Sequence, residues 1–287
     1  MTTVTATKKT TGTDLTGARL TFPHLMLSEW IKMRSIRSTV WCYLVIFVLN
    51  IAISVLASLG VNPTGQHLTG DAANSAVVQF NTANVTITGL VAAVLGVLII
   101  SGEYGTGMIR STFAADPRRY GAVGAKALVL AVTTFVISGV SAGIGVLGSG
   151  PIMSSNNVDV NLGDADVLKP LLGAELYVAM ITLLAFGIGL LIRVSAGGVA
   201  IAVGLLFVVP ILLQVIAALT HQNWITNITQ FLPSQAGGQL YAYQAGTASG
   251  GDNGIISLNA WQGFAVLAAE VVAVGAVAVI LLKRRDA

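Results

Sequence analysis

The sequence predicts an all-α integral membrane protein with six transmembrane helices, and three observations lead to this fold class. Of the 287 residues, 54% are hydrophobic and only 9% are charged, whereas soluble domains carry about 25% charged residues. Six apolar stretches reach the roughly 20 residues that a helix needs to cross the hydrocarbon layer. The lysines and arginines gather at the ends of these stretches. Membrane topology therefore accounts for the net charge of +3, and we expect no nucleic-acid partner.

Two segments precede the first predicted span. Residues 1–21 are polar and rich in threonine, and no apolar core follows their two lysines directly, so we expect a cytoplasmic tail. Residues 22–39 are predicted to form an amphipathic interfacial helix, with basic residues beside an apolar face. That face continues into the first span and contains Phe22, Met26, Trp30, Met33, Ile36 and Val40. The alternative is a plain basic lead-in to the span.

Residues 40–287 are predicted to form a six-span transmembrane domain. The third span is long and rich in glycine, which predicts a tilt or a break, and Pro210 predicts a kink in the fifth. The second span has a polar entry, so its start lies between Val77 and Ala83. Residues 220–260 are too polar to cross the membrane and are expected to form a large outer loop of short elements. The predicted spans are Val40–Leu59, Ala83–Ile100, Ala122–Gly148, Leu171–Ile192, Val199–Leu219 and Trp261–Leu282.

Basic residues in the loops predict the orientation. Six lysines and arginines precede the first span, and residues 101–119 and 283–285 carry three each. Residues 60–82 and 220–260 carry none, and Lys169 is the one basic residue between the third and fourth spans. Because cytoplasmic loops are enriched in Lys and Arg, we expect a multi-pass protein of the cell membrane with both termini in the cytoplasm.

The loop at residues 101–119, SGEYGTGMIRSTFAADPRR, is the most charged interval between spans. Its pattern is Glu-Tyr, then Gly-Thr-x-x-x-Arg, then Pro-x-Arg. Together with the helix SEWIKMRSIRSTVW (Ser28–Trp41) and the large loop before the last of six spans, it resembles the permease subunit of type-two ATP-binding-cassette (ABC) exporters. The resemblance covers nearly the whole chain.

The resemblance implies that loop 101–119 forms a cytoplasmic coupling helix seated on a separate ATPase subunit, which the interfacial helix also touches. We expect Glu103 near the start of that coupling helix, where a carboxylate favours the positive end of the helix dipole. The residues assigned to this ATPase interface are Glu29, Arg34, Glu103, Tyr104, Thr106, Arg110, Phe113, Pro117 and Arg119. The plainer alternative is that the arginines of the loop only obey membrane topology.

The resemblance also implies partners. It predicts two copies of an ABC ATPase subunit, a second permease subunit of the same or similar sequence, and export of a small lipophilic or peptidic substrate. The chain itself is expected to be non-catalytic and to bind no cofactor. A phosphate-binding loop needs G-x-x-x-x-G-K-[ST], and Gly102–Met108 has the glycines without the lysine. ATP and Mg²⁺ are therefore expected on the partner subunit.

Polar residues inside the spans are the candidates for a substrate pathway. Asn81, Asn84 and Thr88 recur at steps of three and four, so they share one helix face. This face either lines a wet pathway or hydrogen-bonds a neighbouring helix. Gln214 and Glu270 complete the candidate set.

Two other functions fit single features of the sequence. Glu270 falls near the middle of the sixth span, and intramembrane carboxylates are costly and often functional, so the first alternative is an ion-coupled carrier. Residues 139–143 match G-x-S-x-G, which would make Ser141 the nucleophile of an intramembrane serine protease with His221 as the only conceivable base. Small residues in such a helix more often allow close helix packing.

The predicted orientation can be tested by labelling. A cysteine introduced at Ser155 or Ser249 should react with a membrane-impermeant reagent in intact cells, because both positions are expected outside. A cysteine at Thr13 should stay unlabelled until the membrane is opened. Labelling at Thr13 alone would contradict the six-span topology.

Overall fold

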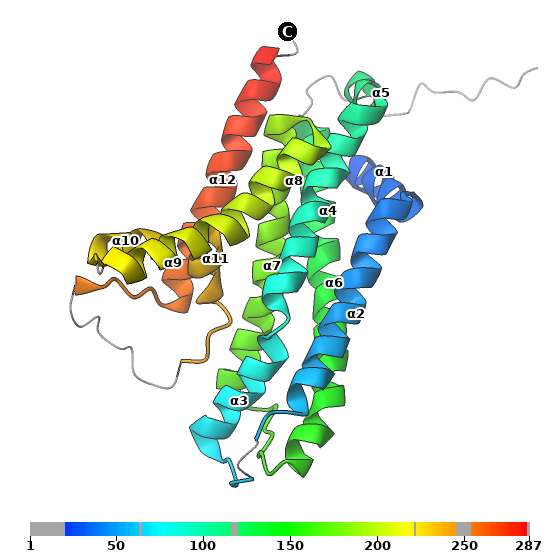
Figure 1. Cartoon of the computed structure of the whole chain (residues 1–287). Coiled ribbons are helices and arrows are strands. Elements are labelled where there is room, and N and C mark those ends of the chain that lie inside the picture. The colour runs from blue at the N-terminus through cyan, green and yellow to red at the C-terminus, as the bar shows by residue number, and fades with distance from the viewer. Residues whose placement is uncertain (1–20, 63–64, 116–119, 221, 245–253, 286–287) are drawn as a thin grey trace, which may run out of the picture.

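A computed structural model of the chain describes residues 21–62, 65–115, 120–220, 222–244 and 254–285. The described chain is built from helices, and six helical segments are long and apolar enough to cross a membrane (Figure 1). These segments are Arg37–Ser58, Gly70–Thr106, Tyr120–Ser155, Ala165–Ile192, Ser195–Thr220 and Ala260–Leu282. The predicted all-α, six-span architecture is therefore confirmed. Residues 1–20 of the predicted tail lie outside the described residues, as do Pro117 and Arg119.

The described α-helices range from 6 to 36 residues in length. In chain order they are α1 Phe22–Ser35, α2 Arg37–Ser58, α3 Gly70–Thr82, α4 Val85–Thr106, α5 Met108–Ala115, α6 Tyr120–Ser155, α7 Ala165–Ile192, α8 Ser195–Val203, the π-helix η2 Gly204–Val208, α9 Val209–Thr220, α10 Asn223–Gln230, α11 Pro233–Gly238 and α12 Ala260–Arg285. The second span consists of α3 and α4, and the fifth runs from α8 through η2 to α9.

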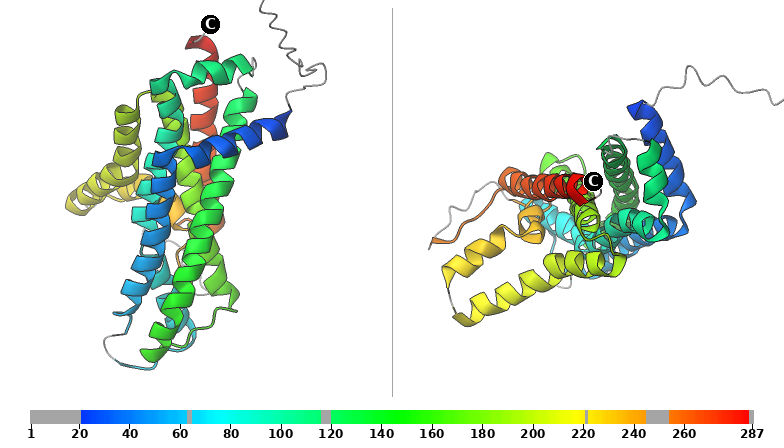
Figure 2. Two further views of the ribbon diagram at one scale, coloured as in Figure 1. Left: turned by 90° about the vertical axis from the view of Figure 1, so that its right-hand side faces the viewer. Right: turned by 90° about the horizontal axis from the view of Figure 1, so that it is seen from above.

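The first helix ends earlier than its sequence pattern predicts. Ile36 adopts an extended backbone conformation (φ −84°, ψ 115°), which separates α1 from α2. Figure 2 shows α1 crossing the bundle at a steep angle to α2. The buried residues of α1 are Glu29 and Met33, whereas Phe22 and Trp30 of the predicted apolar face are exposed. The helix therefore packs on the bundle through a face that includes a carboxylate.

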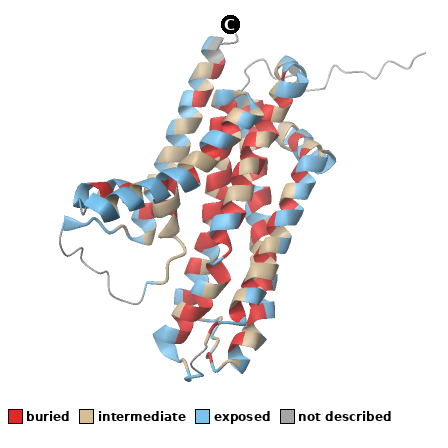
Figure 3. Cartoon of the chain, in the orientation of Figure 1, coloured by how far each residue is buried: buried red, intermediate tan, exposed pale blue. Residues whose placement is uncertain are grey.

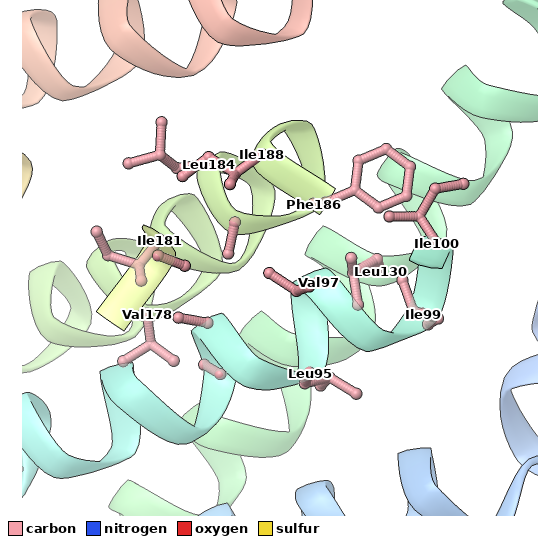
Figure 4. Packing of buried hydrophobic residues seen from close by; sticks show 14 of the residues in the cluster. Leu95, Val97, Ile99, Ile100, Leu130, Val178, Ile181, Leu184, Phe186 and Ile188 are labelled. Atoms are coloured by element: carbon pink, nitrogen blue, oxygen red, sulfur yellow. The ribbon is translucent and has the colours of Figure 1, made fainter. Parts of the chain in front are cut away.

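Close contact between α4 and α7 forms the centre of the bundle. A Cβ atom added at Gly96 of α4 would lie 2.3 Å from the carbonyl oxygen of Thr182 on α7. One added at Gly189 of α7 would lie 3.0 Å from the carbonyl oxygen of Val97. Buried side chains of both helices, including Ile100 and Phe186, fill the space around this contact (Figures 3 and 4). Small residues allow such backbone approach in membranes, where apolar side chains pack as well against lipid as against protein.

The third span is one unbroken helix, so the break that its glycines suggested is not present. At about 1.5 Å per residue, the 36 residues of α6 extend about 54 Å, well beyond the roughly 30 Å of hydrocarbon. The end of α6 packs with α3 and the start of α7 in a separate apolar cluster that includes Val77, Met153 and Val167. These three elements pack together at the end of the bundle shown at the bottom of Figure 1.

A hydrogen-bonded cap holds this end of the bundle together. Asp164 caps α7, accepting a hydrogen bond from the Asp166 backbone N–H at 3.0 Å and one from Asn74 Nδ2 of α3 at 2.8 Å. These two bonds lower the pKa of Asp164 from its ordinary value, the backbone bond most of all. The carboxylate thus joins α3 to the start of α7.

The irregularity predicted at Pro210 takes the form of a π-helix. Residues Gly204–Val208 form the wider turn, and the N–H of Val209 donates to the carbonyl of Gly204. Proline has no N–H and its ring crowds the preceding turn, which the wider turn accommodates. Beyond it, α9 leans away from the bundle (Figures 1 and 2), and Pro210 is its one buried residue.

The short helix α11 lies between α7 and α12, held by three glycines. A Cβ added at Gly237 would meet the Tyr177 ring at 2.3 Å. One at Gly173 of α7 would meet the Leu240 carbonyl at 2.0 Å, and one at Gly263 of α12 would meet the Ala236 carbonyl at 2.2 Å. The part of residues 220–260 that the structure describes thus contains short elements, as expected, and one of them is packed inside the bundle.

The contact between α4 and α7 predicts a large effect of one methyl group. Gly96→Ala should lower the free energy of unfolding by about 1–3 kcal/mol, because the new Cβ overlaps a backbone atom that cannot move freely. Gly139→Ala is the matched control, since a Cβ there meets nothing within 4 Å. Thermal unfolding in mild detergent measures both, and equal melting temperatures would contradict the packing.

Candidate functional site

Four ionic side chains meet where α1, α4 and α6 converge. The ammonium of Lys126 on α6 contacts the carboxylate of Glu29 on α1 and lies 2.7 Å from Glu103 Oε1 on α4. The ammonium of Lys32 on α1 lies 2.7 Å from Glu29 Oε1 and 3.5 Å from Glu103 Oε1. We call these four residues the charge cluster. Its formal charge sums to zero.

The charge cluster is almost sealed from solvent. The side chains of Glu29 and Glu103 are each 2% exposed and that of Lys126 is 4% exposed, while Lys32 reaches the surface at 28%. Lys32 also donates to the hydroxyl of Thr112 at 3.3 Å, which brings α5 into the network. A buried charge is stable only when it is paired and hydrogen-bonded. Four helices are thus joined at one point.

This arrangement changes the interpretation of two predicted interface residues. Glu29 and Glu103 face Lys126 inside the chain, so their carboxylates are not on the surface. Glu103 was expected near the start of a coupling helix, but α4 continues to Thr106 and Glu103 lies near its last turn. A carboxylate is disfavoured at that end of a helix, and the two lysines offset the cost.

Both lysines of the charge cluster, Lys32 and Lys126, were absent from the predicted functional residues, and Lys126 is the more informative of the two. Its signal was present, because it is the single charge in the apolar stretch 121–148. A lone charge inside a span predicts a buried partner. The identity of that partner depends on how the helices cross, which the sequence pattern does not give.

The exposed helix α5 borders a basic concave surface. Gly107 adopts the left-handed conformation (φ 74°) that ends α4 and starts α5. A cavity of about 570 Å³ lies between α5 and the end of α7. Among the residues that line it are Tyr104, Arg110, Phe113 and Arg193. The structure therefore brings three of the predicted interface residues together with Arg193, which was not among the predicted site residues.

Aromatic rings orient two of the arginines at this end of the bundle. The guanidinium of Arg193 lies 5.0 Å from the centroid of the Tyr104 ring, a cation–π contact. Arg34 on α1 lies 6.0 Å from the Trp30 ring centroid. Thr106 instead donates to the backbone of its own helix, to Gly102 O at 2.9 Å. The concave surface combines positive charge with aromatic walls, which suits an acidic or aromatic group.

The candidate pathway residues of the second span are buried between helices. The Ser54 hydroxyl of α2 donates to Asn81 Oδ1, which also accepts from Ser149 Oγ of α6 at 2.8 Å. Asn84 donates to Asn50 Oδ1 of α2. Thr88 donates to the backbone carbonyl of Asn84 at 3.1 Å. This geometry favours the second of the two interpretations, in which the face hydrogen-bonds neighbouring helices.

Gln214 and Glu270 lie apart from that stripe. Gln214 lines a separate cavity of about 250 Å³ between α4, α7, α9 and α11. Glu270 is half-buried on α12, and its Oε2 has no hydrogen-bond partner among the described residues. Glu175 on α7 is buried and hydrogen-bonds Ser138, and its Oε2 is likewise without a partner in the described part of the chain.

Ser141 belongs to the helix–helix contact. Its hydroxyl donates to Ser138 O at 2.8 Å and accepts from Asn50 Nδ2 at 2.8 Å. His221, its only conceivable base, lies outside the described residues. The hydroxyl is therefore engaged in joining α6 to α2.

No protein-family model matches the chain, and neither a curated protein nor a solved structure matches it. The function proposed below therefore rests on the residues and their geometry.

The charge cluster predicts that charge balance, more than any single residue, stabilises this end of the bundle. Lys126→Met should lower the free energy of unfolding by about 3–5 kcal/mol, because two buried carboxylates then share one lysine. The double variant Lys126→Met with Glu103→Gln should recover much of that loss, since it leaves the pair Glu29–Lys32 neutral. Thermal unfolding in detergent is the measurement.

The control for this series is Lys169→Met. The Lys169 side chain is exposed and 3.6 Å from Asp166, so its removal should change stability little. If Lys126→Met were no worse than Lys169→Met, or if the double variant were less stable than the single one, the charge cluster would not hold the helices together.

Proposed function

We propose that this chain is the membrane permease subunit of a type-two ABC exporter, working as a dimer with two separate ATPase subunits docked against α5 and α1. The observation that carries the proposal is the charge cluster, which links α1, α4, α5 and α6 where the exposed helix α5 follows the second span. The sequence pattern of residues 101–119 supplies the class of partner.

The charge cluster gives a physical route from such a partner to the spans. A displacement of α5 would be transmitted to α4 through Gly107, the one residue between them. It would be transmitted to α1 through the hydrogen bond of Lys32 to Thr112, and from α1 to α6 through the ion pair of Glu29 with Lys126. From α4 the movement continues to α7, because their backbones are in contact at Gly96. Packed interfaces move as units between discrete arrangements, so this end of the bundle would move as one body.

The partner-facing residues in this proposal are the exposed and concave ones. Arg110 is exposed on α5, and with Tyr104, Phe113 and Arg193 it lines a basic cavity that would receive an acidic or aromatic side chain of the ATPase. Arg34 adds a second basic position on α1. Glu29 and Glu103 act from inside as positioning residues. A partner can shift the permease between two arrangements only by as much as it binds them differently.

The ion-coupled carrier remains the second candidate because of one observation. Glu270 is half-buried in a span with an oxygen that no described residue hydrogen-bonds. Such a carboxylate is a site for proton or cation binding. This function would need no ATPase, so a partner experiment distinguishes the two.

The test is co-purification from the native membrane. A tagged copy of the chain, extracted in mild detergent, should carry with it a protein that contains G-x-x-x-x-G-K-[ST], identified by mass spectrometry. The purified chain alone should neither bind nor hydrolyse ATP. Arg110→Ala should reduce recovery of that protein about tenfold, which corresponds to about 1.4 kcal/mol of binding free energy.

Arg284→Ala is the matched control, since Arg284 is exposed on α12 and is not among the residues that line the cavity beside α5. It should recover the ATPase as the parent does. Transport by the native chain in proteoliposomes, driven by an ion gradient and abolished by Glu270→Gln without any nucleotide-binding protein present, would overturn the proposal in favour of the carrier.

A further inference from the structure

The cavity that contains Gln214 lies on the side of α4 away from its asparagine stripe. At about 100° per residue, Thr86 points about 200° from Asn84 on the helix. Thr86 lines the cavity, whereas Asn84 is bonded to α2. The cavity is bounded by α4 and α7 on one side and by η2, α9 and α11 on the other. It is therefore separate from both the charge cluster and the stripe.

From its lining we infer that this cavity binds an uncharged amphiphile, a molecule with a hydroxyl or amide head on an apolar body. All of its lining residues are uncharged. An ion entering it would lose its water without gaining a counter-charge, which is strongly unfavourable. A neutral head would meet carboxamides and hydroxyls, both donors and acceptors, from Thr86, Tyr177, Gln214, Ser234, Gln235 and Tyr241.

One of these hydroxyl groups, that of Ser234, lacks a hydrogen-bond partner among the described residues. Its Oγ is shielded from solvent. An unpaired buried hydroxyl is costly, and a ligand that hydrogen-bonds it recovers that cost. By contrast, the Tyr241 hydroxyl is already hydrogen-bonded to Thr86. The Tyr177 and Tyr241 rings, 5.4 Å apart between centroids, offer an aromatic surface for the apolar body.

The cavity opens toward the lipid beside α9. Phe207 and Ile211 line it and are themselves 44% and 43% exposed. The next residues of this segment, Val208 and Leu212, are also exposed and apolar. Only the π-helix and the first turn of α9 separate the cavity from the hydrocarbon. A ligand with an apolar body would enter from the lipid phase.

Binding to this cavity does not depend on an ATPase. The further step, that the bound amphiphile is the exported substrate, rests on the proposed function. If the cavity holds the substrate of the proposed exporter, the substrates are neutral molecules that partition into the membrane and carry a hydrogen-bonding head.

The probe is tritiated monododecanoylglycerol, with the full-length chain in nanodiscs of phosphatidylcholine. Unlabelled monododecanoylglycerol should displace it at concentrations at least tenfold lower than dodecanoate or dodecyltrimethylammonium, which have the same chain and opposite charges. Gln214→Leu and Gln235→Leu should each weaken binding severalfold. Gln222→Leu is the control, because Gln222 is exposed at the start of α10 and outside the cavity.

A space-filling variant keeps the test independent of folding. A Cβ at Gly89 would meet only the Tyr177 ring, at an ordinary 3.5 Å, so Gly89→Ala adds a methyl group to the cavity wall without a clash and should weaken binding severalfold at an unchanged melting temperature. Equal displacement by the charged amphiphiles, or parent-like binding by all three cavity variants, would overturn the inference. Failure to recover an ATPase, with binding intact, would instead count against the proposed function alone.

Discussion

An unpaired polar group is costly in the hydrocarbon interior, and the hydrogen bonds and ion pairs between the helices of the bundle reflect that constraint. Along one face of α6, Lys126, Thr134, Ser141 and Ser149 recur at steps of seven or eight residues, about two helical turns, and each meets a partner on another helix. The first of these contacts along α6 is that of Lys126 in the charge cluster, near α5. The last is the hydrogen bond of Ser149 to Asn81, at the opposite end of the bundle. Since lipid offers no hydrogen bonds, these pairs determine which helices are neighbours and in what register.

Small residues add a second source of stability to the bundle, beside the polar pairs. Apolar side chains gain little by leaving lipid for protein, so close backbone contact supplies the remaining attraction. Gly96 and Gly189 bring α4 and α7 together, and Gly237 seats α11 against Tyr177. The inserted α11 also forms one wall of the amphiphile cavity. The same packing that stabilises the fold therefore builds the candidate binding site.

Length and hydropathy were sufficient to predict the six spans, because a helix in a bilayer must satisfy its own backbone. Periodicity placed Asn81, Asn84 and Thr88 on one face but did not distinguish water from a neighbouring helix. Glu103 and Lys126 are separated by 23 residues, and Lys126 and Glu29 by 97, so their meeting depends on helix crossings that no local pattern encodes. The π-helix before Pro210 was predicted only as a kink.

The neutrality of the charge cluster has an evolutionary consequence. A single substitution that removes or reverses one of its four charges leaves an uncompensated ion in the interior, so viable descendants must change two positions together. Among divergent homologues, an acidic residue lost at 103 should coincide with a basic residue lost at 126 or 32. Such covariation between two positions stays detectable when overall sequence identity is low, so it can be used to recognise distant homologues of this chain.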